Sequence, residues 1–96
     1  EIPVINGTVE LAEKGFIPGG SKRNLESCKK CTYFSESLSE TEKLILADAQ
    51  TSGGLLLSLS EKNAHSFITE FKDESNVEAV IIGKMIEKGK DTITVN

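Results

Sequence analysis

Two glycine-centred stretches hold the residue types best suited to face a phosphorylated ligand. They are residues 19–24, with the sequence GGSKRN, and residues 48–54, with the sequence DAQTSGG. Because glycine has no Cβ, its backbone amide can approach an anion closely, and neighbouring amides can point into one concavity. Lys22 and Arg23 add positive charge to the first stretch, and both stretches contain hydroxyl groups. The two stretches therefore predict surfaces that face a small polar or anionic group.

Each stretch also has a purely structural interpretation. Gly19-Gly20 follows Pro18 and is compatible with a tight turn alone, and Gly53-Gly54 is compatible with close packing of a strand against a helix. Asp48 is equally suited to tethering its turn through backbone amides. Neither stretch has the GxxxxGK[S/T] spacing of a P-loop, and a predicted strand follows the second one. The residues alone support an anion-adjacent α/β domain and nothing more specific.

Cys28 and Cys31 form a C-x-x-C pair, which supplies half of a four-ligand zinc site. The sequence has no second pair, and His65 is distant along the chain. A thioredoxin-like redox pair would stand at the start of a helix, after a strand, whereas we expect a loop here. Free thiols or an incidental disulfide are therefore favoured, and a shared metal site and redox chemistry stay open. We expect reduced thiols and a cytoplasmic protein.

The composition is that of an ordinary soluble globular chain. Of the 96 residues, 38% are hydrophobic and 27% charged, and no apolar run approaches the ~18–20 residues that cross a bilayer. The net charge of −4 argues against broad binding to nucleic acid or to an acidic membrane. Residues 22–30 nevertheless contain four cations and one carboxylate, which favours a small anionic ligand. The start, Glu1-Ile2-Pro3-Val4, has no initiator Met, so we expect a piece of a longer chain.

The first half of the chain predicts two helices joined by a long loop. Asn6 or Thr8 can cap the first helix, and Gly15 can end it in a left-handed conformation. Residues 16–37 show no regular period and predict an irregular loop. Ser39-Glu40-Thr41-Glu42 is a capping box, in which Ser39 and Glu42 satisfy each other's backbone amides, so a second helix begins there.

The second half predicts strands around one amphipathic helix. Residues 54–59 form a nearly continuous apolar run, typical of a strand buried on both faces, and residues 77–86 predict a second strand. Ser60 can cap the helix between them, with Ala64, Phe67, Ile68 and Phe71 in one stripe and His65 exposed beside it. A turn at residues 88–91 leads to a last strand at 92–95. The fold class is an α/β (α+β) sandwich, with helices packed on a mixed sheet.

Several separated segments, in the same order, carry a resemblance to a known family. They are Ile2-Pro3-Val4, Phe16-Ile17-Pro18-Gly19-Gly20 with Arg23-Asn24, residues 46–56 (LADAQTSGGLL) and residues 79–85 (AVIIGKM). In these segments the chain resembles the C-terminal domain of the selenophosphate synthetases (selenide, water dikinases). That family belongs to the aminoimidazole ribonucleotide synthetase superfamily. The resemblance implies one partial domain, residues 1–96, that is truncated at its N-terminus and belongs to a two-domain enzyme.

The resemblance also implies an activity for the parent enzyme. ATP, selenide and water would give selenophosphate, orthophosphate and AMP, with ATP and Mg²⁺ bound mainly by an N-terminal domain that also forms a homodimer. The family's catalytic and metal-binding residues lie before this segment, so we expect no catalytic or metal-binding residue here and no turnover by this chain alone. We also expect the chain alone to self-associate, because it lacks its neighbours. For this chain we expect a supporting face toward the N-terminal domain and the phosphate site, formed by Gly19, Gly20, Arg23, Asn24, Asp48, Gln50, Thr51, Ser52, Gly53 and Gly54.

Two other interpretations stay open. One is a sister enzyme of the same superfamily, such as an aminoimidazole ribonucleotide synthetase or a hydrogenase-maturation factor. The other is a stand-alone module that binds an anion or a metal through Lys22, Arg23 and the cysteine pair. The QTSGG string and the Pro-Gly-Gly with Arg-Asn favour the selenium enzyme.

Overall fold

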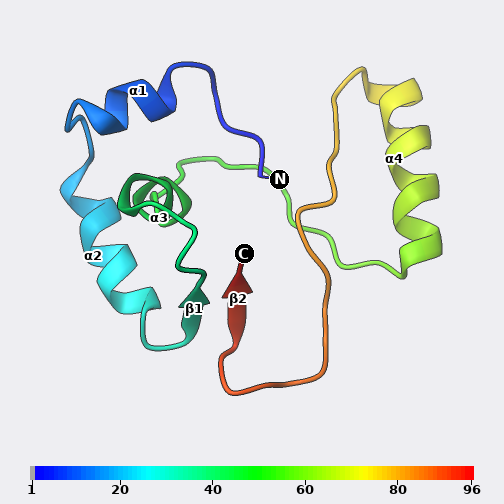
Figure 1. Cartoon of the computed structure of the whole chain (residues 1–96). Coiled ribbons are helices and arrows are strands. Elements are labelled where there is room, and N and C mark those ends of the chain that lie inside the picture. Colours follow the sequence, from blue (N-terminus) through cyan, green and yellow to red (C-terminus); the bar gives the residue numbers. More distant parts are fainter. Residues whose placement is uncertain (1) are drawn as a thin grey trace. The chain divides into compact units, whose positions relative to one another are not determined.

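A computed structural model describes residues 2–96 and divides them into two compact units (Figure 1). The larger unit comprises Ile5–Gly53 together with Glu87–Asn96. The smaller unit comprises Gly54–Ile86 and the described residues that precede Ile5. Glu1 lies outside the described residues. The main segment of the smaller unit, Gly54–Ile86, thus lies along the sequence between the two parts of the larger unit.

Helices and one small sheet build the larger unit. Its elements are α1 (Thr8–Glu13), α2 (Gly19–Cys28), β1 (Thr32–Phe34), α3 (Glu40–Leu46) and β2 (Ile93–Val95). The two strands pair in parallel (Figure 1), and their register places Thr32 opposite Ile93 and Phe34 opposite Val95. Helices α1 and α2 both pack against α3. Leu25, which is 3% exposed, and Ala12 are its buried apolar side chains within the described chain.

Glycines bound helix α1 on both sides. Its N-cap is Gly7, with φ of 87°, so the prediction of an Asn6 or Thr8 cap is wrong. Gly15 follows the helix with φ of 87°, which confirms the predicted left-handed end. Glycine reaches this region without steric cost, whereas a side chain would strain it.

Helix α2 and strand β1 correct the prediction of an irregular loop over residues 16–37. Gly19 and Gly20 occupy the first turn of α2, where two poor helix formers hide the helical signal. The helix is nevertheless amphipathic, because Ser21 and Leu25 are four residues apart and both are buried. Packing of this face supplies the stabilisation that intrinsic propensity does not.

Helix α3 begins with the predicted capping box. The hydroxyl of Ser39 accepts the backbone N–H of Glu42 at 3.2 Å, and the carboxylate of Glu42 accepts the backbone N–H of Ser39 at 2.7 Å. Two amides that the helix itself leaves unpaired are therefore satisfied. The predicted helix start is confirmed.

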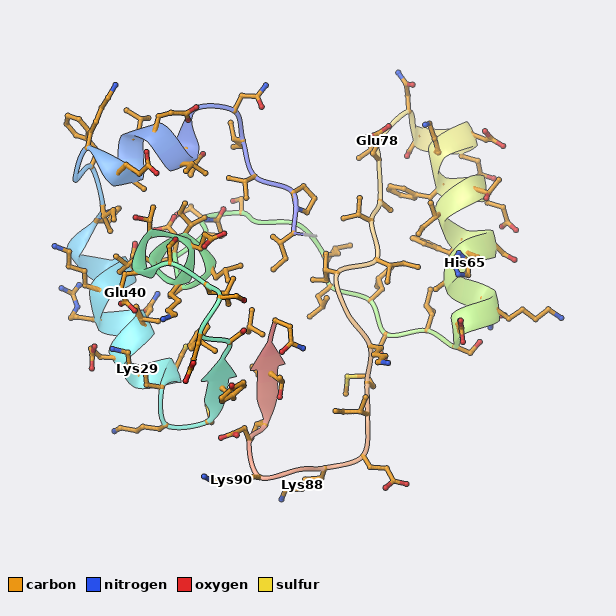
Figure 2. The ribbon with its side chains drawn as sticks, viewed as in Figure 1. Lys29, Glu40, His65, Glu78, Lys88 and Lys90 are labelled. Atoms are coloured by element: carbon orange, nitrogen blue, oxygen red, sulfur yellow. The ribbon has the colours of Figure 1, made fainter. Side chains whose placement is uncertain are left out.

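The smaller unit is built around helix α4 (Glu61–Ser75). Ser60 occupies the N-cap position as predicted, but its side chain makes no capping hydrogen bond within residues 2–96. The predicted stripe of Ala64, Phe67, Ile68 and Phe71 is the half-buried face of this helix. Within it the rings of Phe67 and Phe71 stack with centroids 5.3 Å apart. His65 is exposed as predicted, and Figure 2 shows it on α4.

The two long strands predicted in the second half are absent from residues 2–96. Residues 54–59 and 77–86 run without regular secondary structure, and Leu55 is 93% exposed where burial on both faces was predicted. A strand is stable only with a hydrogen-bonded neighbour, and these segments have none within the described chain. The structure is therefore α+β with a two-stranded parallel sheet, and the predicted sandwich on a mixed sheet is wrong for residues 2–96.

The last part of the chain agrees with the prediction. Bends at residues 87–92 lead into β2, the predicted final strand, and Lys88 and Lys90 lie on this connection (Figure 2). Within residues 2–96, none of the helices has the length and apolar character needed to cross a bilayer.

Candidate functional site

The start of α2 and the turn after α3 are joined by side-chain hydrogen bonds. The hydroxyl of Ser21 donates to Oδ1 of Asp48, which lies just beyond the end of α3. The side-chain amide of Asn24 donates to the carbonyl oxygen of Ala47 at 3.1 Å. Both contacts lie within the larger unit. Two stretches that stand far apart in the sequence therefore meet in one place.

Asp48 acts as a tether in this arrangement. Its Oδ1 accepts the Ser21 hydroxyl, and its Oδ2 accepts the side-chain amide of Gln50 at 3.1 Å. With an acceptor bond on each oxygen, the carboxylate fixes the turn against α2. No group of three His, Cys, Asp or Glu side chains that could hold a metal occurs among residues 2–96.

Ser21 is the one residue that contributes a side chain to this cluster and was not among the predicted site residues. Its side chain is 1% exposed, and the Asp48 carboxylate satisfies its hydroxyl. A hydrogen bond to a charged group contributes more than one between neutral groups, so this bond is a strong local constraint. The four-residue spacing between Ser21 and Leu25 would have identified Ser21 as a buried residue. That signal can be used only after α2 has been recognised as a helix.

The N-terminal end of α2 presents backbone amides and a guanidinium. Pro18 is the N-cap, and no side chain of residues 2–96 caps the helix there. Unpaired amides at a helix start carry partial positive charge. A Cβ placed on Gly19 would lie 3.4 Å from Nη1 of Arg23, so the guanidinium lies over the backbone of Gly19. Gly19 and Gly20 therefore begin a helix, and the interpretation as a tight turn alone is wrong.

The second predicted stretch forms an exposed turn. Thr51 and Ser52 are exposed, and Ser52 has φ of 53°, in the left-handed region. A Cβ on Gly53 would come within 3.1 Å of Cβ of Gln50, so this position favours glycine. Gly54 begins the Gly54–Ile86 segment of the smaller unit.

The basic segment over residues 22–30 is divided by the helix. Lys29 forms an ion pair with Glu26 at 2.7 Å at the C-terminal end of α2, where Figure 2 labels it. The hydrogen bond and the charge of Glu26 raise the pKa of Lys29 above its ordinary value. Lys22 and Arg23 belong to the first half of α2, close to the Ser21–Asp48 contact. Positive charge that is not paired within α2 therefore lies toward its N-terminal half.

The cysteine pair lies at the other end of α2. Cys28 is the last residue of the helix and is half-buried, and Cys31 is exposed in the turn before β1. Both thiols are free. The pair thus joins a helix to a strand, instead of lying in the predicted irregular loop.

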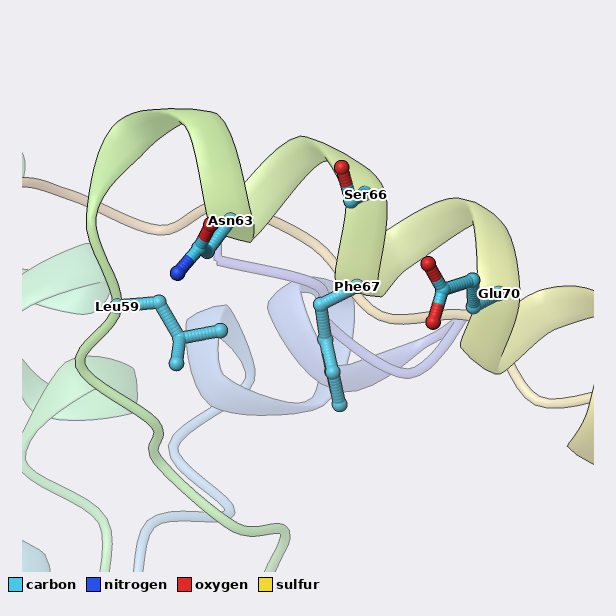
Figure 3. Close-up of a pocket in the computed structure, with 5 residues that line it drawn as sticks. All are labelled: Leu59, Asn63, Ser66, Phe67 and Glu70. Atoms are coloured by element: carbon cyan, nitrogen blue, oxygen red, sulfur yellow. The ribbon is translucent and has the colours of Figure 1, made fainter.

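A shallow groove in the smaller unit contains none of the predicted site residues (Figure 3). Its side chains come from α4 and from the residue just before the N-cap of that helix. They are Leu59, Asn63, Ser66, Phe67 and Glu70. With one carboxylate and no cation, this groove does not have the chemistry of a phosphate site.

Similar proteins found by comparison of sequences carry one and the same name. No protein-family model and no solved structure matches the chain. Over its full 96 residues the chain is 42% identical to a selenide, water dikinase of Campylobacter jejuni subsp. jejuni serotype O:2, of which it covers 27%. The enzymes of the same name from Clostridioides difficile and Myxococcus xanthus are 37% and 40% identical over 98% of the chain. The chain spans about a quarter of the length of these relatives.

Proposed function

Because this chain is related in sequence, over its whole length, to the selenide, water dikinases, we propose that it is the C-terminal domain of a selenophosphate synthetase. The predicted resemblance is confirmed by these relatives, among which identities of 35–42% extend over nearly the full chain. About three quarters of each relative lies outside the matched region. We therefore assign the parent enzyme the conversion of ATP, selenide and water into selenophosphate, orthophosphate and AMP.

The chemical steps of this reaction belong to the part of the enzyme outside this chain. The only carboxylate in the cluster, Asp48, already accepts hydrogen bonds on both oxygens. The cluster therefore uses its carboxylate as a tether and offers a supporting surface. Its role is to support and close a nucleotide and phosphate site on the neighbouring N-terminal domain.

The observation that carries this role is the Ser21–Asp48 hydrogen bond. It fixes the start of α2 against the turn after α3 and leaves Gly19 and Arg23 exposed at one end. Amides at a helix start together with a guanidinium favour phosphate oxygens, which arginine can hold with two parallel bonds. The N-terminal end of α2 is therefore the surface that faces phosphate in the closed enzyme.

Replacing Arg23 in the full-length enzyme tests this role. Arg23→Ala removes charge-assisted hydrogen bonds worth about 1.5–3 kcal/mol, so we expect kcat/KM for ATP to fall roughly 10- to 100-fold. Arg23→Lys keeps the charge but not the fork, so its activity should be intermediate. The measurement is ATP- and selenide-dependent release of AMP.

Lys30→Ala is the matched control for Arg23→Ala. Lys30 is also exposed and basic, but it lies beyond the C-terminal end of α2. We expect this variant to keep the wild-type kcat/KM. Equal activity of the Arg23→Ala and Lys30→Ala enzymes would contradict the assigned role of α2.

A further inference from the structure

The connection between α2 and β1 brings two thiols together. The backbone N–H of Cys31 donates to the carbonyl oxygen of Cys28 at 3.0 Å, which closes a turn from residue 28 to residue 31. Such a turn keeps its end Cα atoms within about 7 Å, and a disulfide needs about 4.4–6.8 Å. Sγ of Cys31 lies 3.5 Å from the same carbonyl oxygen, so this thiol is directed toward Cys28.

The surroundings of the pair favour an anionic reaction partner. Cys31 is exposed, and Cys28 is half-buried behind it. Lys29 and Lys30 separate the two cysteines in the sequence, and Lys30 forms no ion pair within residues 2–96. A nearby cation attracts a negatively charged oxidant. The exposed thiol is therefore the one that reacts first.

We propose that Cys28 and Cys31 form a reversible disulfide, with a low-molecular-weight disulfide such as glutathione disulfide as the oxidant. The Cys31 thiolate attacks one sulfur of the oxidant, forms a mixed disulfide and releases one glutathione thiolate. The Cys28 thiolate then attacks the Cys31 sulfur and releases the second. The two cysteines lose two protons and two electrons, and two molecules of glutathione thiol are formed. This assignment does not depend on the proposed function.

Disulfide formation would constrain Cys31, the residue at which the two strands of the sheet first meet. The carbonyl oxygen of Cys31 accepts the backbone N–H groups of Thr92 at 2.9 Å and Ile93 at 3.1 Å. The same residue therefore joins α2, β1 and the start of β2. A bond from Cys31 to Cys28 links that residue covalently to the C-terminal end of α2.

Peptide mapping of the full-length protein after equilibration in glutathione buffers tests the proposal. Free thiols are trapped by alkylation before digestion with trypsin, which cleaves after Lys29 and Lys30 and so separates the two cysteines. In oxidising buffer we expect the peptide 24–29 linked to the peptide 31–43. Reductant should separate them. Recovery of both peptides in alkylated form across the whole series would overturn the proposal.

Single substitutions distinguish the second step from the first. In Cys28→Ser, Cys31 should accumulate a mixed disulfide with glutathione, several-fold more than in the wild type, because no neighbour resolves it. In Cys31→Ser, Cys28 should react more slowly, because it is less exposed. A wild-type protein that accumulates as much mixed disulfide as Cys28→Ser would contradict an internal bond. The wild-type peptide map decides the question even if a variant folds poorly.

Discussion

Ser21 joins two segments that stand 27 positions apart in the sequence. Its buried hydroxyl bonds to a carboxylate that also holds Gln50, so one small side chain fixes both the start of α2 and the turn after α3. Neither glycine stretch contains a large apolar side chain that could do this by packing. The polar contact therefore sets the geometry of the candidate site.

Ser21→Ala tests this contact at the residue scale. The change removes a hydrogen bond to a charged group, and we expect a loss of about 1.5–3 kcal/mol in the free energy of unfolding of the larger unit. Urea denaturation followed by circular dichroism is the measurement. Ser27→Ala is the matched control, because that exposed hydroxyl bonds only to the Arg23 carbonyl of its own helix, at 3.0 Å. A cost for Ser21→Ala no larger than for Ser27→Ala would show that the contact does not hold the site.

Residue patterns predicted this site only in part. The two glycine stretches were identified as candidates, and Asp48 was recognised as suited to a tether, because their residue types are unusual. Ser21 was missed as the contact point, because its role depends on helical spacing from Leu25 and on a partner 27 residues away. Which side chains meet is a property of the tertiary packing, and no local pattern in the sequence records it.

At the scale of the element, the start of α3 gives stability that depends on pH. The hydrogen bonds from the side chain and the backbone N–H of Ser39 lower the pKa of Glu42 below its ordinary value of 4.5. Since the folded-state pKa of Glu42 is depressed, the ionised carboxylate stabilises the folded state fully above the unfolded-state pKa. This stabilisation is lost as the pH falls through the folded-state pKa. We expect α3 to weaken below about pH 4.5.

Circular dichroism between pH 6 and pH 3 measures this effect. The helical signal of the wild type should fall over this range more than that of Glu42→Gln, which has no charge to lose.

Ser39→Ala should lower the free energy of unfolding by about 1 kcal/mol at neutral pH, as loss of an N-cap typically does. Glu36→Gln, a change at an exposed position before α3, is the control. Identical pH profiles for the wild type and Glu42→Gln would refute the role of the carboxylate.

The capping box and the long strands differ in how much they depend on distant residues. Ser39 and Glu42 satisfy each other within one turn, so their pattern was sufficient to predict the start of α3. The apolar stripe of α4 was similarly local. Residues 54–59 and 77–86 have the composition of strands, but a strand forms only beside a partner, and the described chain does not supply one. The spacing of apolar residues therefore predicted helix α4 correctly, whereas composition predicted these strands incorrectly.

At the scale of the whole molecule, exposed apolar residues are concentrated in the smaller unit. Leu55, Leu56 and Met85 are 93%, 79% and 87% exposed. Exposed apolar surface commonly marks an interface, and extended segments without a partner strand can pair with another chain. We therefore expect the isolated chain to self-associate in solution.

Size-exclusion chromatography with light scattering measures this association. Leu55→Lys should shift the chain toward the monomer, because it removes apolar surface and adds charge. Ser58→Lys is the matched control, since it adds the same charge at an exposed polar position in the same segment. A chain that is monomeric at all concentrations would disprove the expectation.

The isolated chain is also expected to lack activity. It spans about a quarter of its relatives, and its described residues include no metal-binding cluster. ATP and selenide should therefore give no AMP above background in a coupled assay. Release of AMP by the purified 96-residue chain would contradict the placement of the reaction in the remaining part of the enzyme.

The pairing of β1 with β2 also sets an order of events during translation. The larger unit needs Ile93–Val95 to complete its sheet, yet the ribosome makes Gly54–Ile86 first. A nascent polypeptide that has emerged only as far as α4 still has the Cys31 carbonyl without its amide partners. The segment Gly54–Ile86 can thus fold before β2 has been synthesised, whereas the larger unit completes its sheet only after β2 has emerged.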